Sequence, residues 1–412
     1  MTPLPGALAP FRIRSFRFQW PADLLISLAF EMEVLILGWY VLVETGSVML
    51  LTLYASLLYI GTLVAPMFGV IGDQIGHRIV LFGARTTYMV LAAIITILAF
   101  TGLLSPVYVL ITTAFAGLGR PSDIGVRSAL VAATVPPGSL VGAMSISRMT
   151  ADFARIMGAL VGAGLFVAFG MGPAYAAITC LYALGAMLLL GAGPEMLQSS
   201  VNRVARASPW RDLAAGMIYL WNMPRLLAVM WIAFLINLCA FPLVTGLMPY
   251  VAKSVYGTDQ AGFGYLVASL AFGALCGSLA LSIAGERMRV ERTMIASMVG
   301  WYVMLIVFGH IQDMTAGMIC LFIIGVTQGA SMITLAVMLL RTAAPEYRGR
   351  VMGVRMLAIY GNPVGLLVAG TLVERIGYAG TAFVYGTAGL AFTMIVLLRW
   401  RAAVLPAKAA SG

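Results

Sequence analysis

The sequence predicts an all-α integral membrane protein with twelve transmembrane helices, built as two six-helix bundles related by pseudo-symmetry. Three observations lead to this prediction: the composition, the recurrence of long apolar runs, and a weak repeat between the two halves of the chain. Of the 412 residues, 61% are hydrophobic and only 10% are charged, whereas about 25% of the residues of a soluble domain are charged. So few charges cannot cover a surface in water, and we expect the chain to lie in a lipid bilayer.

Apolar runs long enough to cross a membrane recur along nearly the whole chain. A bilayer core requires roughly 20 apolar residues of helix. In the first half, hydropathy and turn signals predict spans at residues 20–44, 49–72, 79–102, 106–129, 139–168 and 172–193. In the second half they predict spans at residues 225–252, 258–283, 293–312, 315–341, 351–373 and 379–399. The predicted domains are therefore two six-helix bundles, 1–193 and 225–412.

The linker between the bundles, residues 194–224, is the longest polar stretch of the chain. Its segment "SPWRDLAAGMIYLWNM" (208–223) alternates polar and apolar residues, as does a helix that lies on a membrane surface. We therefore expect an amphipathic helix in a cytoplasmic linker.

The two halves repeat one another at a constant offset. Pro136 in "TVPPGSLVGAM" and Pro345 in "AAPEYRGRVMG" are separated by about 210 residues, and so are Gly46 and Gly257, each before the second helix of its half. An offset near half the chain length indicates duplication of a six-helix unit. This arrangement favours transport by alternating access.

Basic residues of the loops are distributed unevenly. With the N-terminus in the cytoplasm, the cytoplasmic segments hold Arg78, Arg203, Arg206, Arg211, Arg287, Arg289, Arg292, Arg348, Arg350, Arg399, Arg401 and Lys408. The opposite side holds only Lys253 and Arg375. The positive-inside rule then predicts that both termini lie in the cytoplasm. The localisation we expect is the inner membrane of a bacterium, with multiple spans.

The loop between the second and third spans reads "GVIGDQIGHR", with Gly69, Asp73, Gly76 and Arg78. The glycines allow two helix ends to approach closely and turn sharply, while the carboxylate can face a helix N-terminus or an arginine. This loop resembles the signature of the major facilitator superfamily. The resemblance implies a conformational latch, in which we expect Asp73 to lie close to Arg127 and to the start of the eleventh span near Arg350.

Further segments resemble the branch of that superfamily that contains enterobactin exporters and macrolide efflux proteins. In chain order they include "FRIRSFRFQW", "LGWYVLVETGS", "VRSALVAATVP", "FARIMGALVGAGL", "YRGRVMG" and "LVAGTLVERIG". The resemblance implies export of siderophores, drugs or other amphipathic molecules by proton antiport. In the fifth span, the glycine–proline pattern of antiporters keeps Gly158, Gly162 and Gly164, but Ala159 replaces the proline.

Ionisable residues inside spans cost roughly 2.5–3.5 kcal/mol on insertion scales, so each is a candidate functional residue. Glu31 and Glu33 of the first span are two positions, about 200°, apart and face different sides. Glu31 shares a polar stripe with Asp23 and Ser27 and has no cation on its own helix face. We expect Glu31 to couple proton movement to transport. A paired structural role is the alternative for both glutamates.

Two later spans of the first half each carry an aspartate between two arginines on one helix face. The triads are Arg120, Asp123 and Arg127, and Arg148, Asp152 and Arg155. We expect both aspartates to stay ionised and to form ion pairs within the first bundle. Two roles are open for the triads: they stabilise the structure or gate the transporter, or they contact the substrate.

The spans of the second half carry polar rather than charged candidates for a substrate cavity. These are Asn237, Gln328, Tyr360 and Asn362. Methionines accompany them, and two Met-x-x-x-Met pairs, Met294/Met298 and Met314/Met318, raise the alternative of a copper path, because thioethers are soft ligands. Packing in the core is the more common role of membrane methionines. No metal site is therefore predicted.

These features predict a secondary active exporter of a small amphipathic molecule, driven by proton antiport. The alternative is an importer of a nutrient or a metal ion such as copper. The chain has two histidines and neither a metal-binding helix motif nor a nucleotide loop, so we expect no enzyme and no cofactor beyond the proton gradient. The expected partners are a small-molecule substrate and the bilayer. A net charge of +10 spread over short loops predicts no nucleic-acid partner, and we expect a monomer.

Overall fold

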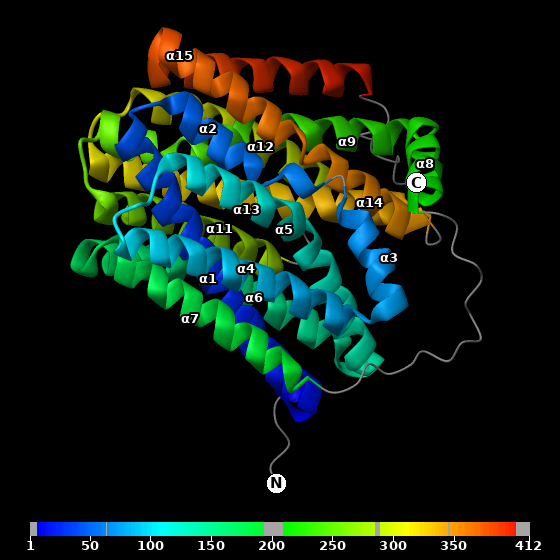
Figure 1. The fold of residues 1–412 in the computed structure, drawn as a ribbon. Coiled ribbons are helices and arrows are strands. Elements are labelled where there is room, and N and C mark those ends of the chain that lie inside the picture. The colour runs from blue at the N-terminus through cyan, green and yellow to red at the C-terminus, as the bar shows by residue number, and fades with distance from the viewer. Residues whose placement is uncertain (1–5, 63, 193–208, 285–288, 345–346, 401–412) are drawn as a thin grey trace. The chain divides into compact units, whose positions relative to one another are not determined.

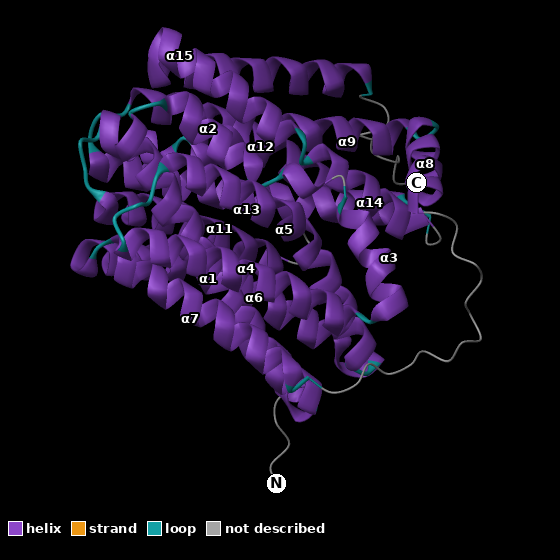
Figure 2. Cartoon of the chain, viewed as in Figure 1, coloured by secondary structure: helices purple, strands orange, loops and turns teal. Residues whose placement is uncertain are grey.

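The computed structural model describes residues 6–62, 64–192, 209–284, 289–344 and 347–400 (Figure 1). Every regular element in these ranges is a helix (Figure 2). The chain divides into two compact units. Unit 1 comprises Met1–Thr45 and Leu57–Arg206, and unit 2 comprises Gly46–Ser56 and Ala207–Gly412. The all-α prediction is confirmed.

Unit 1 is built around one long helix. Its α-helices are α1 (Arg14–Thr45), α3 (Ala65–Ile75), α4 (His77–Phe100), α5 (Pro106–Thr134), α6 (Pro137–Phe169) and α7 (Met171–Leu190). Short 3-10 helices are η1 (Gly6–Arg12) and η2 (Ile60–Thr62). The central helix is α1, because it packs against α5, α6 and α7, while α4 packs against α5 and α7.

Unit 2 contains the remaining helices. They are α2 (Val48–Leu57), α8 (Pro209–Trp221), α9 (Pro224–Leu235), α10 (Met248–Tyr250), α11 (Gln260–Ala284), α12 (Val290–His310), α13 (Met314–Thr342), α14 (Arg348–Ala358) and α15 (Gly361–Arg399). Between α9 and α11 the chain forms π-helical turns η4 (Ile236–Ala240), η5 (Pro242–Gly246) and η6 (Val251–Val255). Pro242 and Pro249 lie in this stretch, where a missing backbone N–H prevents regular α-helical bonding.

Helix α11 packs closely along α13 in unit 2. A Cβ on Gly273 or Gly277 of α11 would collide with the backbone of α13 at Phe322 or Val326. The two backbones therefore approach to a distance that only small residues permit, as in many membrane helix pairs.

Corresponding turns of the two halves use the same backbone conformation. Gly46 and Gly257 have φ angles of 63° and 62°, and Gly170 and Gly377 have φ angles of 78° and 72°. Residues other than glycine rarely adopt positive φ. Each pair is separated by about 210 residues, the offset seen in the sequence repeat, so the structure supports the predicted duplication. Gly377 interrupts α15, which divides that helix into two segments.

The described helices are consistent with twelve spans. Nine helices among the described residues are long and apolar enough to cross a membrane, and one of these covers both α14 and α15. The 29-residue α5 and the consecutive helices α2 and α3 account for the remaining predicted spans. The predicted boundaries lie within a few residues of the observed ones; α5, for example, begins at the predicted residue 106.

Residues 46–56, which the sequence analysis placed in the first bundle, pack with unit 2. Ser56 Oγ donates a hydrogen bond to the Pro363 carbonyl at 3.2 Å, and the Met49 N–H donates to Glu374 Oε1 at 3.3 Å. A Cβ on Gly370 would collide with the Thr52 side chain. The close contact of α2 with α15 explains this grouping. The expected linker helix is present as α8, while residues 194–208 lie outside the described part of the chain.

Candidate functional site

Charged side chains on the helices of unit 1 are joined in ion pairs. In the described part of this unit, five acidic residues bond to five arginines: Asp23 to Arg85 and Arg127, Asp123 to Arg127, Glu33 to Arg120, Glu31 to Arg155, and Asp152 to Arg148. They form two buried networks and two partly exposed pairs.

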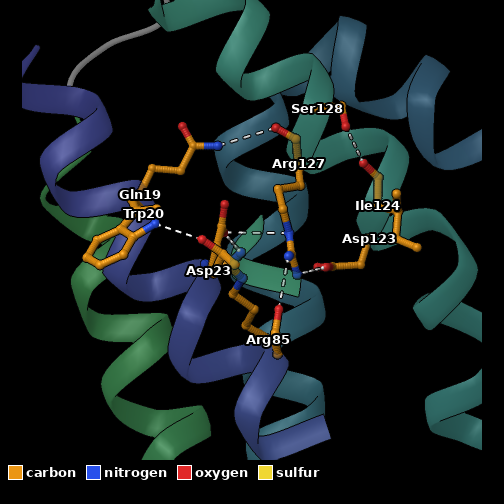
Figure 3. A network of polar contacts seen from close by, with 10 residues as sticks. Gln19, Trp20, Asp23, Arg85, Asp123, Ile124, Arg127 and Ser128 are labelled. Atoms are coloured by element: carbon orange, nitrogen blue, oxygen red, sulfur yellow. Dashed lines mark hydrogen bonds and ion pairs between the residues drawn. The ribbon is translucent and has the colours of Figure 1, made fainter. Parts of the chain in front are cut away.

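The first network, called here the Asp23 network, joins α1, α4 and α5 (Figure 3). Asp23 accepts a hydrogen bond from Arg85, whose side chain is 0% exposed. Arg127 Nε lies 3.7 Å from Asp23 Oδ1, and Arg127 Nη2 donates to Asp123 Oδ2 at 2.5 Å. Gln19 Nε2 donates to the Arg127 carbonyl at 3.3 Å. The Gln19–Arg127 hydrogen bond thus connects residues more than 100 positions apart in the sequence.

Two carboxylates and two guanidinium groups balance one another in the Asp23 network. A charge buried without a partner costs several kcal/mol, so such groups persist in a membrane interior only when they are paired and hydrogen-bonded. Arg127 Nη1 also donates to Ser27 Oγ at 3.1 Å. The geometry is that of a scaffold that fixes α1 against α4 and α5.

The second network, called here the Glu33 network, lies further along α1. Glu33 is buried and accepts hydrogen bonds from Arg120, from Tyr182 at 2.6 Å and from Tyr175 at 3.2 Å. The Arg120 guanidinium also lies 4.3 Å from the centroid of the Phe30 ring. The tyrosines of α7 thereby connect to α1 and α5 through a single carboxylate.

The two remaining pairs lie along α6 and differ from the networks in exposure. Arg155 Nε lies 3.6 Å from Glu31 Oε1, and Arg148 Nε lies 3.3 Å from Asp152 Oδ2. The arginine side chains are 43% and 68% exposed, whereas Glu31 is 21% exposed. Because both arginines are more exposed than those of the networks, these pairs are held less firmly.

Glycines of α6 bring Glu31 to this position. A Cβ on Gly158 would lie 2.6 Å from the Glu31 Cβ, and one on Gly162 would lie 3.0 Å from the Met32 Cα. The α6 and α1 backbones are therefore in close contact where the glutamate lies. Gly164, in contrast, has open space at its Cβ position.

The structure gives two of these charges partners on other helices. Glu31 has a cationic neighbour, because the close contact of α1 with α6 brings Arg155 to it from another helix. Arg120 of α5 bonds Glu33 of α1. The expectation that the α6 charges form ion pairs within the first bundle is met by Arg148–Asp152 and Arg155–Glu31.

Three bonded side chains were not among the predicted site residues: Arg85, Tyr175 and Tyr182. Arg85 is an arginine in the middle of the predicted span 79–102, and its position alone was a signal of a paired charge. Tyr175 and Tyr182 are seven positions apart, two turns of one helix face, which could have indicated a shared polar partner.

The four candidates of unit 2 lie on three segments. Asn237, in η4, donates from its side chain to the Ala233 carbonyl of its own helix at 2.9 Å. Gln328 of α13 and Asn362 of α15 are buried, and Tyr360 directly precedes α15. Segments η4 and α15 pack against each other, so Asn237 and Asn362 belong to one helix pair.

The loop motif between α3 and α4 has the expected tight turn. Gly76 has a φ of 99°, and its N–H bonds the Gly72 carbonyl at 2.8 Å. Arg78 donates to the carbonyl of Leu190, the last residue of α7, where a cation is favoured by the helix dipole. Gly69 and Asp73 lie in α3, but their side-chain surroundings fall outside the described part of the structure, so the Asp73 latch stays a prediction.

Residues that could hold a metal ion do not gather in the described ranges: no three histidine, cysteine, aspartate or glutamate residues there form such a group. Met294 and Met298 of α12 are fully buried, as expected for methionines that pack in a helical core.

Several efflux proteins are similar in sequence to this chain. The chain is 24% identical to the multidrug efflux pump Tap of Mycolicibacterium fortuitum, over 83% of this chain and 85% of that protein. It is 22% identical to macrolide efflux protein A of Streptococcus pyogenes, over 86% and 87%. It is 27% identical to the enterobactin exporter EntS of Citrobacter koseri, over 84% and 81%.

Solved structures of transporters share the fold. The D-xylose-proton symporter matches with a TM-score of 0.74 at 12% identity, covering 94% of this chain and 97% of its own. The nucleoside transporter NupG matches with a TM-score of 0.70 at 14% identity, covering 94% and 99%. The sequence profile of the transmembrane secretion effector family matches residues 5–411. The chain therefore belongs to the transmembrane secretion effectors of the major facilitator superfamily.

Proposed function

We propose that this protein is a secondary active exporter that moves a small amphipathic molecule out of the cell in exchange for protons, by alternating access. Its family and the efflux proteins to which it is similar support the export of small molecules. We infer the proton coupling and the substrate class from the site itself.

The observation that carries the proton coupling is the contact between Glu31 and Arg155. Glu33 has three bonding partners, and Asp23 contacts two arginines. Among the described contacts, Glu31 has a single ion pair at 3.6 Å, and it is partly exposed. Protonation of Glu31 therefore disrupts fewer described interactions than protonation of Glu33 or Asp23 would, and it releases Arg155.

Antiport requires that the proton and the substrate exclude each other. A cationic or hydrogen-bond-donating group of the substrate that replaces Arg155 at the Glu31 carboxylate would compete with a proton for the same oxygen atoms. In the resting state Arg155 would occupy that place. An amphipathic molecule with such a group meets this requirement.

Reconstituted vesicles with an imposed pH gradient test the proposal, with ethidium as the fluorescent amphipathic probe. The unchanged protein should accumulate ethidium against its concentration gradient, on the side with the higher proton concentration. Glu31→Gln mimics the protonated form, so it should keep ethidium exchange and lose uphill transport.

Two controls separate the parts of the proposal. Uphill transport by Glu31→Gln together with its loss in Glu33→Gln would identify Glu33 as the coupling residue, and uphill transport by both would place coupling elsewhere. If the unchanged protein moves ethidium but ignores the pH gradient, proton antiport is wrong. Movement in the same direction as protons would indicate the alternative, an importer.

A further inference from the structure

We propose that helix α8 inserts one apolar face into the interface of the lipid bilayer while its opposite face clamps the turn between α13 and α14. The proposal concerns an interaction surface outside the transport site and does not depend on the transported molecule. Three observations carry it: the exposed stripe of α8, its distance from a membrane span, and its contacts within unit 2.

One side of α8 carries large apolar side chains that the described protein leaves uncovered. Met217, Ile218 and Trp221 are 39%, 64% and 66% exposed. Their spacing of one, three and four positions places them on one helix face. Ile218 and Trp221 are among the most exposed hydrophobic residues of unit 2, yet α8, with 13 residues, is too short to cross a bilayer.

The position of α8 in the chain identifies what covers this stripe. Helix α8 ends at Trp221, and α9 begins at Pro224. The segment that starts at Pro224 is a candidate membrane span. Two intervening residues reach at most about 10 Å, so the end of α8 must lie at the membrane boundary. Tryptophan is enriched at that depth, where its ring meets both acyl chains and water.

The opposite face of α8 packs against other helices of unit 2. Figure 1 shows α8 beside α14. The Tyr219 ring stacks on the Tyr347 ring, with centroids 4.1 Å apart and planes 7° apart. The Tyr219 hydroxyl accepts a hydrogen bond from the Ala344 N–H at 3.1 Å. A Cβ on Gly216 would lie 3.1 Å from atoms of Arg350 and Val354 in α14. Helix α8 is thus fixed to the turn before α14.

These contacts join the bilayer interface to a turn that connects two membrane helices. A helix held by lipid on one side and by Tyr347 on the other limits how far that turn can move.

Fluorescence quenching in nanodiscs of the full chain tests the inserted face. Subtracting the emission of Trp221→Phe from that of the unchanged protein isolates Trp221. We expect a blue-shifted component, quenched more strongly by lipids brominated near the headgroup than by lipids brominated near the chain end. Trp301→Phe is the matched control, since Trp301 is 1% exposed and its component should resist both lipids.

Three outcomes would overturn the proposal. Quenching of Trp221 by iodide in water, without quenching by brominated lipid, would place the stripe in solvent. Resistance to all quenchers would show that another part of the chain covers it. Stronger quenching near the chain end than near the headgroup would place α8 in the bilayer core.

Discussion

Burial decides what each arginine of unit 1 contributes to stability. Arg85 and Arg148 both bond an aspartate, but Arg85 is completely buried and Arg148 is largely exposed. Removing one partner of a buried pair leaves a desolvated charge, at a cost of about 3–5 kcal/mol, whereas an exposed pair contributes about 0–1 kcal/mol. The two arginines therefore provide a matched comparison within one unit.

Arg85→Gln should lower the free energy of unfolding in detergent by about 3–5 kcal/mol, because Asp23 loses its most buried partner. Arg148→Gln should change it by less than about 1 kcal/mol. Chemical or thermal unfolding of the purified variants measures both. If both variants lost a similar amount of unfolding free energy, the Asp23 network would not act as a scaffold.

Tyr182→Phe should also destabilise unit 1, because its hydroxyl donates at 2.6 Å to Glu33, the ion-pair partner of Arg120. A hydrogen bond to a charged group contributes about 1.5–3 kcal/mol, and one between neutral groups about 0.5–1.5 kcal/mol. Tyr385→Phe is the neutral control, since that hydroxyl donates to the Gly365 carbonyl at the same distance. An equal or smaller loss for Tyr182→Phe in the same unfolding experiment would contradict a charged Glu33.

The ion pairs that could be predicted are those whose partners are close in sequence. Asp123 and Arg127, like Arg148 and Asp152, are four positions apart, and helical periodicity alone places them together. Arg85 finds its partner 62 positions away, and Arg120 finds Glu33 87 positions away. Those pairings depend on how α1 packs among its neighbours, which hydropathy does not determine.

Helix packing depends on a few glycines whose positions the sequence makes visible. Gly158 and Gly164 both lie in α6 and both belong to the antiporter-like pattern, yet only Gly158 faces α1. The same substitution at the two sites thus separates the effect of helix contact from the intrinsic preference of the residue for a helix.

Gly158→Ala should reduce stability and transport, because the added Cβ would lie 2.6 Å from the Glu31 Cβ and force α6 away from α1. Gly164→Ala meets no neighbouring atom and should be neutral or stabilising by up to about 1 kcal/mol, since alanine favours a helix. Melting temperature and ethidium transport in vesicles measure the two effects. If Gly164→Ala lowered the melting temperature and transport as much as Gly158→Ala, close contact of α6 with α1 would not be the cause of the Gly158→Ala effect.

Most elements follow from hydropathy, because a span must be a continuous apolar helix with its backbone bonded internally. Two features of the fold could not be predicted from hydropathy. Residues 46–56 group with unit 2 through contacts such as Ser56 to Pro363, 307 positions apart. The π-helical turns of residues 236–255 arise from local competition between proline and helix geometry, which periodicity does not report.

At the scale of the whole molecule, the uneven distribution of basic residues predicts orientation. Alkaline phosphatase fused after Gly257, beside Lys253, should be active because it reaches the periplasm, where its disulfides form. A fusion at the C-terminus should be inactive, while green fluorescent protein at the same place should fluoresce. The opposite pattern would reverse the proposed topology.

The pairing of the unit 1 acids with arginines has an electrical consequence. Five carboxylates and five guanidinium groups leave this set without net charge, so the membrane voltage does no net work when the set moves as a body. One proton added at Glu31 introduces a single positive charge, on which 100 mV does about 2.3 kcal/mol of work. The proton-loaded form of this set would then respond to voltage and the unprotonated, empty form would not, so movement of the proton-loaded set would generate a measurable current.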